Sequence, residues 1–204
     1  GQTLALHTHD LHRQTDYGRA VRAVHAKAHG IIEGRMTVLD GLPPELAQGL
    51  FATSGTYPVI LRLSTNAGDI LDDAISLPRG LAMKVVGVKG ERLAGAEGET
   101  QDFVMVNGKV FQAKTANQFL RSLKGLALTT DRLDGTKKAV STILRGVSAA
   151  LKTLGVESSA INSLGGAPNV DPLGETYYSV TPFRYGDYIA KFSLAPVSDD
   201  LLEL

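Results

Sequence analysis

Three segments of strand length follow one another in the first half of the chain, and they constrain its fold more than any other feature. YPVILRLST covers residues 57–65, RGLAMKVVGV covers residues 79–88, and QDFVMVNG covers residues 101–108. Each is rich in β-branched and other apolar residues, with Gly, Pro, Asn and Asp between them, as is typical of β-strands and their connections. The segment that joins the first two, NAGDILDDAISLP, is expected to be a loop. Strands joined by loops rather than by helices predict antiparallel pairing.

Helical patterns accompany these strands. A short helix is expected in DGLPPELAQGLFA, because Pro43-Pro44 favours a helix start. Apolar residues recur at helical spacing in residues 115–127 and again in residues 136–155. Residues 175–197 then predict a hairpin with Tyr185-Gly186-Asp187 at its turn. This order of elements predicts an α+β fold, an antiparallel β-barrel with helices laid outside it.

The region before the first clear strand is less regular. Residues 1–18 are polar and are expected to form an N-terminal arm, whereas residues 19–204 are expected to form one domain. The start of that domain, residues 19–39, has a β-like pattern, with Gly30 and Gly34 as expected bulges.

Composition excludes several classes of function. The chain has no cysteine, which excludes disulfides, thiolate metal sites and cysteine nucleophiles. Lys plus Arg and Asp plus Glu both total 21, so the net charge gives no overall attraction to nucleic acid or to a membrane surface. No apolar run reaches the roughly 18 residues that a membrane span needs, and no signal peptide is visible. These features favour a cytoplasmic protein, with the periplasm as the alternative.

One histidine lies in a setting that calls for an explanation. His25 lies in AVRAVHAKAHG, an apolar stretch that several basic side chains interrupt, and Arg22 precedes it by three residues. Burial disfavours the charged form of a histidine, and a neutral imidazole is what a general base needs. Two interpretations stay open, a structural histidine in the core or a catalytic base beside a cofactor.

Two polar residues interrupt the first clear strand. Arg62 and Ser64 are separated by one residue, so they point to one face, whereas Val59, Leu61 and Leu63 point to the other. An arginine beside a hydroxyl suits an anionic ligand and an oriented imidazole. The alternative is a strand face that simply meets water.

Taken together, these motifs resemble the haem catalase family, and most closely its small bacterial catalase-related members. The resemblance covers residues 19–120 well and residues 174–197 more loosely. It rests on three motifs in register, followed by two aromatic positions: Arg22-Ala23-Val24-His25-Ala26-Lys27, Arg62-Leu63-Ser64-Thr65, Pro78-Arg79-Gly80, Phe103 and Phe111.

The resemblance implies a haem b inside a β-barrel and a small-molecule peroxide as substrate. It gives His25 the role of distal acid–base, which takes a proton from the near oxygen of a peroxide and returns it to the far oxygen. Ser64 would hydrogen-bond the other ring nitrogen of His25 and determine its tautomer. The residues implied to contact the cofactor are Arg22 and Arg62 at the haem propionates, Val24 and Phe111 on the porphyrin, and Gly80 and Phe103.

The chain departs from the family pattern in the distal amide. Catalases carry a distal asparagine, but the matching stretch AEGETQDFV contains none, and Gly98 falls nearest that position. Gln101 is the expected substitute amide donor. Weaker orientation of the peroxide would favour peroxidase chemistry, or an organic hydroperoxide, over rapid dismutation.

The second departure concerns the ligand of the haem iron. The family's proximal tyrosine lies beyond a hairpin such as residues 174–197, so the metal ligand is expected after Leu204 and the chain is expected to be an N-terminal part of a longer protein. Arg184 and Tyr188 have the family's spacing, but in a hairpin that spacing does not stack them. Residues 1–204 alone are therefore expected to form an incomplete barrel, to bind haem poorly and to self-associate through an open sheet edge, with a homo-oligomer as the result.

Two other functions stay open beside a peroxide-decomposing enzyme. Allene oxide synthases share the fold and isomerise fatty-acid hydroperoxides, but they carry Thr before the distal histidine, where this chain has Val24. A non-enzymatic barrel that binds a small apolar ligand would use the same apolar interior without needing His25 beside Arg22.

Overall fold

The computed structural model describes residues 18, 21–22, 24–68, 70–75, 77–111, 113–129 and 170–204. The expected arm, apart from Gly18, and the expected helix over residues 136–155 lie outside these described residues.

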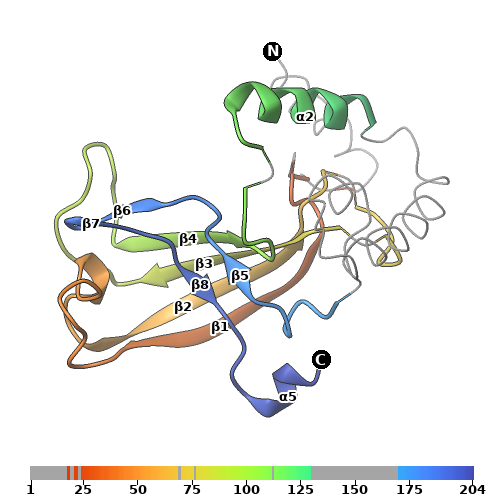
Figure 1. Cartoon of the computed structure of the whole chain (residues 1–204). Helices are drawn as coiled ribbons and strands as arrows, with labels where there is room; N and C mark the ends of the chain where they lie inside the picture. Colours follow the sequence, from red (N-terminus) through yellow and green to blue (C-terminus); the bar gives the residue numbers. More distant parts are fainter. Residues whose placement is uncertain are drawn as a thin grey trace, which may run out of the picture.

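Six strands form one antiparallel sheet in the order β1-β2-β3-β4-β5-β8. Figure 1 shows that this sheet curls, with the short strands β5 and β8 in front of the long ones. In chain order the strands are β1 (Ala28–Val38), β2 (Gly55–Thr65), β3 (Arg79–Val86), β4 (Thr100–Val106), β5 (Tyr177–Tyr178) and β8 (Ser193–Leu194).

The three segments that predicted antiparallel strands are confirmed as β2, β3 and β4. The β-like pattern of residues 19–39 becomes a strand only from Ala28 onward. A register shift between Ala28 and Gly30 confirms the first expected bulge, whereas Gly34 pairs regularly with Val59 and forms none. The sheet was expected to have an open edge after residues 175–197. Among the described strands, β8 forms one edge of the sheet. The eleven-residue β1 forms the other edge, which is longer.

The prediction of a helix after Pro43-Pro44 is wrong. The backbone N–H groups of Leu46 and Ala47 both donate to Pro43 O, which makes a single turn, and only a three-residue 3-10 helix, η1 (Gly49–Phe51), follows. Gly49 has a φ of 52°, a left-handed conformation that a continuous right-handed helix through residues 44–51 could not contain.

The helix α2 (Ala116–Thr129) confirms the first of the two later helical patterns. Thr115 begins it as an N-cap, since its Oγ1 accepts a hydrogen bond from the backbone N–H of Gln118. A four-residue helix near the end of the chain, α5 (Asp199–Leu202), was not expected. Figure 1 shows α2 and α5 outside the sheet, on opposite sides of it.

The predicted hairpin is confirmed in its central part. The strands β6 (Phe183–Tyr185) and β7 (Tyr188–Ala190) pair as a separate two-stranded sheet, with Tyr185 opposite Tyr188. Gly186 has a φ of 59°, as a tight two-residue turn requires.

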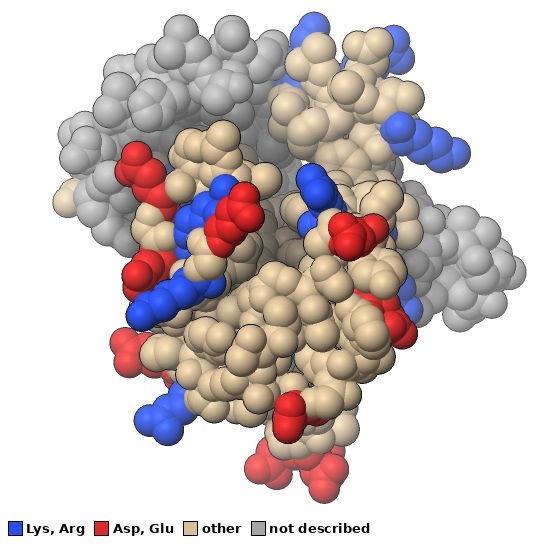
Figure 2. Space-filling view, turned by 90° about the vertical axis from the view of Figure 1, so that its left-hand side faces the viewer, with Lys and Arg blue, Asp and Glu red and all other residues tan. Residues whose placement is uncertain are grey.

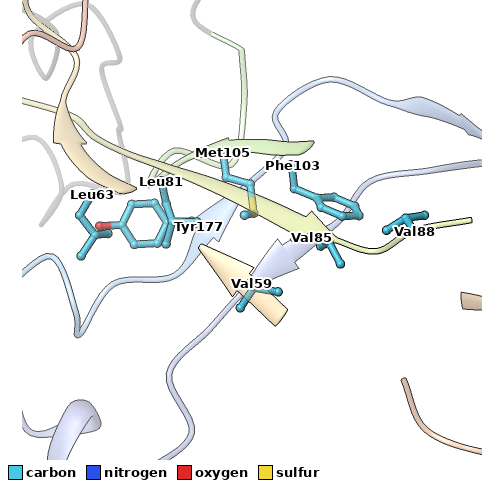
Figure 3. Close-up of a cluster of buried hydrophobic side chains, with 8 residues drawn as sticks. All are labelled: Val59, Leu63, Leu81, Val85, Val88, Phe103, Met105 and Tyr177. Carbon is cyan, nitrogen blue, oxygen red and sulfur yellow. The ribbon is translucent and has the colours of Figure 1, made fainter. Parts of the chain in front are cut away.

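The hydrophobic core lies on one face of the curled sheet, which we call the core face (Figure 3). Directly paired residues of an antiparallel sheet share a face, and Leu63, Leu81 and Met105 form such a row. Tyr177 on β5 packs in the same cluster as Leu63 on β2, although two strands lie between them in the sheet. The sheet therefore curls toward the core face. The buried cluster is Val59, Leu63, Leu81, Val85, Val88, Phe103, Met105 and Tyr177.

These observations give a mostly β, antiparallel half-barrel with few short helices in the described residues. The antiparallel sheet and the external helices of the sequence-based prediction are confirmed. The α+β assignment is not met by the described part of the chain, where α2 is the one helix longer than four residues.

Neighbouring residues on β4 provide a matched test of which face is the core. Met105 is 2% exposed and Val104 is 66% exposed. Met105→Ala should lower the free energy of unfolding by about 2–5 kcal/mol because it leaves a cavity in the core, whereas Val104→Ala should change it by no more than about 0.5 kcal/mol. Urea unfolding of both variants measures the difference, and equal losses would contradict this assignment of the faces.

Candidate functional site

Two polar clusters lie at the same end of β2 and β3, on opposite faces of the sheet. Ser64 pairs with Gly80 and Thr65 pairs with Arg79, so each pair shares a face and the two pairs point in opposite directions. His25 contacts the first pair and His29 contacts the second. The face that carries Ser64 and Gly80, opposite the core face, is called the His25 face below.

Hydrogen bonds determine the tautomer of His25. Its Nδ1 lies 3.0 Å from Ser64 Oγ, and the Ser64 hydroxyl donates to Gly80 O at 3.4 Å. Ser64 Oγ then accepts from His25 Nδ1–H, which leaves the lone pair on Nε2. Among the described residues, no side chain or backbone group hydrogen-bonds to that Nε2. The predicted contact between Ser64 and His25 is confirmed.

The backbone of His25 is held in an unusual conformation. Its φ is 53°, in the left-handed region that a residue with a Cβ rarely adopts. Arg62 Nη2 donates to His25 O at 2.7 Å, and His25 N donates to Asn66 O. Arg62 therefore supports the loop that presents the imidazole.

Gly80 forms the floor beneath the His25 ring. A Cβ added to Gly80 would lie 2.5 Å from His25 Cε1 and 2.8 Å from His25 Nδ1, closer than van der Waals contact permits. Gly80 was expected to contact the cofactor, but here it contacts His25. Only a residue without a side chain lets the imidazole lie this close to the strand.

The surroundings of His25 keep it neutral. Burial lowers the pKa of its imidazole below the ordinary 6.5, and the positive charges of Arg62 and Arg22 lower it further. The pKa of Arg62 is itself lowered by burial and by Arg22. Within the described part of the chain, no carboxylate forms an ion pair with either arginine. Two guanidinium groups thus lie near a neutral base, and no carboxylate of the described residues pairs with them.

The strand face that carries Arg62 is partly buried and partly exposed. Ser64 is buried and Arg62 is half-buried, whereas the exposed apolar side chains of Ile31 and Val104 lie in the same cross-strand row as Arg62 and Ala82. The His25 face therefore combines an imidazole, guanidinium groups and apolar surface.

Two expected site residues are not brought to His25. Phe103 is buried on the core face, where its ring packs edge-on against Phe51 and Phe192. Phe103 pairs with Met83, which is next to Ala82 on β3. Because successive residues of a strand point to opposite faces and Ala82 belongs to the His25 face, Phe103 points to the core face.

Gln101 also lies away from His25. It is five residues from Val106, the β4 partner of Gly80, which is about 16 Å along the strand. Its side chain is exposed and donates to Asp102 O. The proposed replacement of the distal amide by Gln101 is therefore not supported by its position.

Three further expected site residues lie at the surface. Arg22, Val24 and Phe111 are exposed, and Phe111 packs against Phe119 at the start of α2. Arg22 is near enough to His25 to lower its pKa, as described above.

The core side of the sheet is packed with apolar side chains. Side chains from β2, β3, β4 and β5 fill the inside of the curl (Figure 3). The expectation of a haem inside the barrel stays a prediction. The His25 ring lies on the opposite face of the sheet.

Arg184 and Tyr188 occupy the hairpin and not a helix. Arg184 pairs with Ile189, and Tyr188 pairs with Tyr185. The expectation that their spacing does not stack them is confirmed.

The second cluster was not predicted as a site. Arg79 Nη1 donates to Thr65 Oγ1 at 2.8 Å and lies 3.1 Å from His29 Nε2, which is 2.7 Å from the Thr65 hydroxyl. A signal for it was present in the sequence, since Thr65 and Arg79 directly adjoin Ser64 and Gly80 and must point to the opposite face. The bulge at Gly30 was expected, but its position alone did not indicate that His29 would contact them.

Basic and acidic side chains lie close together on one face of the molecule. Figure 2 shows Lys and Arg side chains beside Asp and Glu on one face, with uncharged surface between them.

No group of three or more His, Cys, Asp or Glu residues that could hold a metal ion occurs among the described residues. In the same part of the chain, no helix is long and apolar enough to cross a membrane.

The close approach at Gly80 is directly testable. Gly80→Ala should displace the His25 ring from Ser64 and toward solvent, because the added methyl group occupies its place. The pKa of His25, followed by NMR, should then rise toward 6.5. Gly108→Ala is the matched control, since a Cβ there meets nothing within 4 Å. An unchanged His25 pKa in Gly80→Ala would contradict this packing.

Stability should depend on pH through both histidines. Burial lowers the folded-state pKa of His25 and of His29, so below about pH 6.5 the unfolded chain binds protons that the folded chain does not. The free energy of unfolding should therefore fall as the pH falls from about 7.5 to about 5. Urea titrations at both pH values measure this change, and it should be smaller in His25→Ala than in the unaltered chain.

Comparison of the chain with protein-family models and with curated proteins finds no match. The likeness to haem catalases therefore rests on the sequence motifs themselves. To these motifs the structure adds the contact of His25 with Ser64, its packing on Gly80 and its support by Arg62.

Proposed function

We propose that this chain belongs to a haem-dependent enzyme that decomposes peroxides, of catalase or peroxidase type, acting on hydrogen peroxide or small organic hydroperoxides. One observation carries the proposal. His25 is a neutral imidazole whose Nδ1 is held by Ser64 and whose Nε2 has no partner among the described residues. A ring oriented from one side, with a free lone pair on the other, is the arrangement of a general base.

His25 would move one proton during turnover. Its Nε2 would accept the proton of the near peroxide oxygen and return it to the far oxygen, while the haem would supply the two electrons that cleavage of the O–O bond needs. Ser64 keeps the proton of the resting imidazole on Nδ1, and Arg62 and Arg22 disfavour the imidazolium form. The imidazole therefore returns the proton readily after accepting it.

The residues of the His25 face fit haem b in two respects. Arg22 and Arg62 have no carboxylate partner among the described residues, and haem propionates are anions that a guanidinium binds well. The exposed Ile31, beside Arg62, and Val104, on the far side of Ala82, lie in the same cross-strand row and offer apolar surface to a macrocycle. The redox chemistry of iron, which no side chain of this chain supplies, is what haem contributes when bound.

No described tyrosine is assigned as a ligand of the haem iron. Burial raises the pKa of Tyr177 and of Tyr185. Their hydroxyl groups donate to the backbone carbonyls of Pro172 and Leu46. Tyr188 lies on the exposed β6–β7 hairpin. The proposal therefore draws its support from the distal side and assigns no iron ligand.

The fold agrees with a catalase-like architecture in its coarse features. A curled antiparallel sheet places His25, Arg62 and Ser64 together in the order that the motifs imply. Because Gln101 lies far from His25, the proposal favours peroxidase chemistry or an organic hydroperoxide over rapid dismutation.

The test separates the proton-transfer role from the binding role. In the expected longer protein, reconstituted with haem, His25→Ala should retain the haem and lose peroxide turnover by about 10²–10⁴-fold, the usual scale of acid–base catalysis. Arg62→Ala should instead raise the haem dissociation constant by about 10–100-fold, because one charge-assisted contact is lost. Arg35→Ala, on the exposed part of β1, is the control for a lost guanidinium.

The outcomes distinguish the alternatives. Unchanged turnover in His25→Ala would overturn the role of His25. Isomerisation of a fatty-acid hydroperoxide without peroxidation would favour an allene oxide synthase type of activity. Failure of the expected longer protein, of which this chain would be the N-terminal part, to retain haem, measured by its absorption spectrum, would favour a non-enzymatic protein that binds an apolar ligand.

A further inference from the structure

The cluster around Arg79 borders a pocket of about 300 Å³ on the side of the sheet opposite His25. The volume lies at the lower end of the range for small-molecule sites. The lining residues are His29, Asp73, Arg79, Val170, Asp171 and Pro172. One wall of this pocket is thus basic, another is acidic, and Val170 and Pro172 are apolar.

Arg79 carries a buried charge that forms no ion pair among the described residues. The residue is only 4% exposed. Its Nη1 is used by Thr65 and His29, whereas its buried Nε has no hydrogen-bond partner among the described residues. A buried guanidinium is costly unless an anion compensates it. Because Arg79 lines the pocket, its charge suits the pocket to a carboxylate.

His29 presents a second donor to the pocket. Its Nε2 faces an N–H of Arg79 and the hydroxyl of Thr65, so this nitrogen is the acceptor and the ring proton resides on Nδ1. The Nδ1 atom lies 4.0 Å from Asp73 Oδ1, too far for a hydrogen bond. Burial and Arg79 lower the pKa of His29, which agrees with the neutral ring.

The acidic wall supplies acceptors. Asp171 accepts a hydrogen bond from the backbone N–H of Leu173 through Oδ1 and is exposed. Asp73 forms an ion pair with Lys27 at 2.7 Å, so part of its charge is already compensated. Asp171 is therefore the better partner for a cationic group of a ligand.

We propose that this pocket binds a small zwitterion of the α-amino-acid type, with its carboxylate at Arg79 and His29 and its ammonium group at Asp171. Val170 and Pro172 then contact a short apolar side chain. The inference goes beyond the proposed peroxide chemistry and does not depend on it, because the two clusters lie on opposite faces of the sheet.

Calorimetric titration of the unaltered chain with three matched ligands tests the proposal. L-alanine carries both charges, N-acetyl-L-alanine only the carboxylate, and L-alaninamide only the ammonium group. L-alanine should bind, and each blocked ligand should bind at least about tenfold more weakly, because one charge-assisted contact is lost. No binding of L-alanine, or equal binding of either blocked ligand, would overturn the proposal.

Two variants test the residues. Asp171→Asn retains an oxygen that can accept from Leu173 and removes the charge, so it should weaken L-alanine binding by about tenfold while leaving the binding of N-acetyl-L-alanine unchanged. Asp187→Asn, in the β6–β7 turn, is the control and should have no effect. Unchanged L-alanine binding in Asp171→Asn would refute the assignment. Because Asp171 is exposed, this variant avoids the risk that replacing the buried Arg79 unfolds the chain.

Discussion

The pairing register of β2 with β3 is the constraint on which both polar clusters depend. Ser64 lies opposite Gly80, and Thr65 lies opposite Arg79. Because neighbouring residues of a strand point to opposite faces, the two pairs lie on opposite faces of the sheet. A shift by one residue would bring every buried side chain of β2 to the wrong side. Leu61 and Leu63, which pack in or against the core, hold this register in place, and the same packing positions Ser64 for His25.

The core thus has a functional consequence beyond stability. Polar groups at the end of β2 and β3 remain in register only because the apolar part of the same strands is packed against Phe103, Met105 and Tyr177. The backbone of His25 adopts a left-handed conformation, which is unfavourable for a residue with a side chain. Arg62 and Asn66 compensate by binding that backbone directly.

Prediction from sequence succeeded where a local pattern and its environment agreed. The three long strands, α2 and the turn at Gly186 all carry their signal within a few residues. The helix expected after Pro43-Pro44 failed because Gly49 takes a positive φ, which a count of apolar spacing does not detect. The resemblance to catalases assigned Phe103 to the cofactor, but Phe103 packs in the core. The alternation of side chains between the two faces of β4 played no part in that assignment.

The sequence by itself determined the antiparallel strands, the shared face of Arg62 and Ser64, and the choice of His25 as the residue to examine, because these depend on alternation and on local residue chemistry. Only the tertiary structure decided that the His25 ring lies on Gly80, that Gln101 is remote, and that His29 joins Arg79 and Thr65 on the opposite face. Such contacts join residues that are dozens of positions apart. Their existence depends on strand register, on a bulge and on the direction of curl, which are set by packing of the whole sheet and not by any one segment.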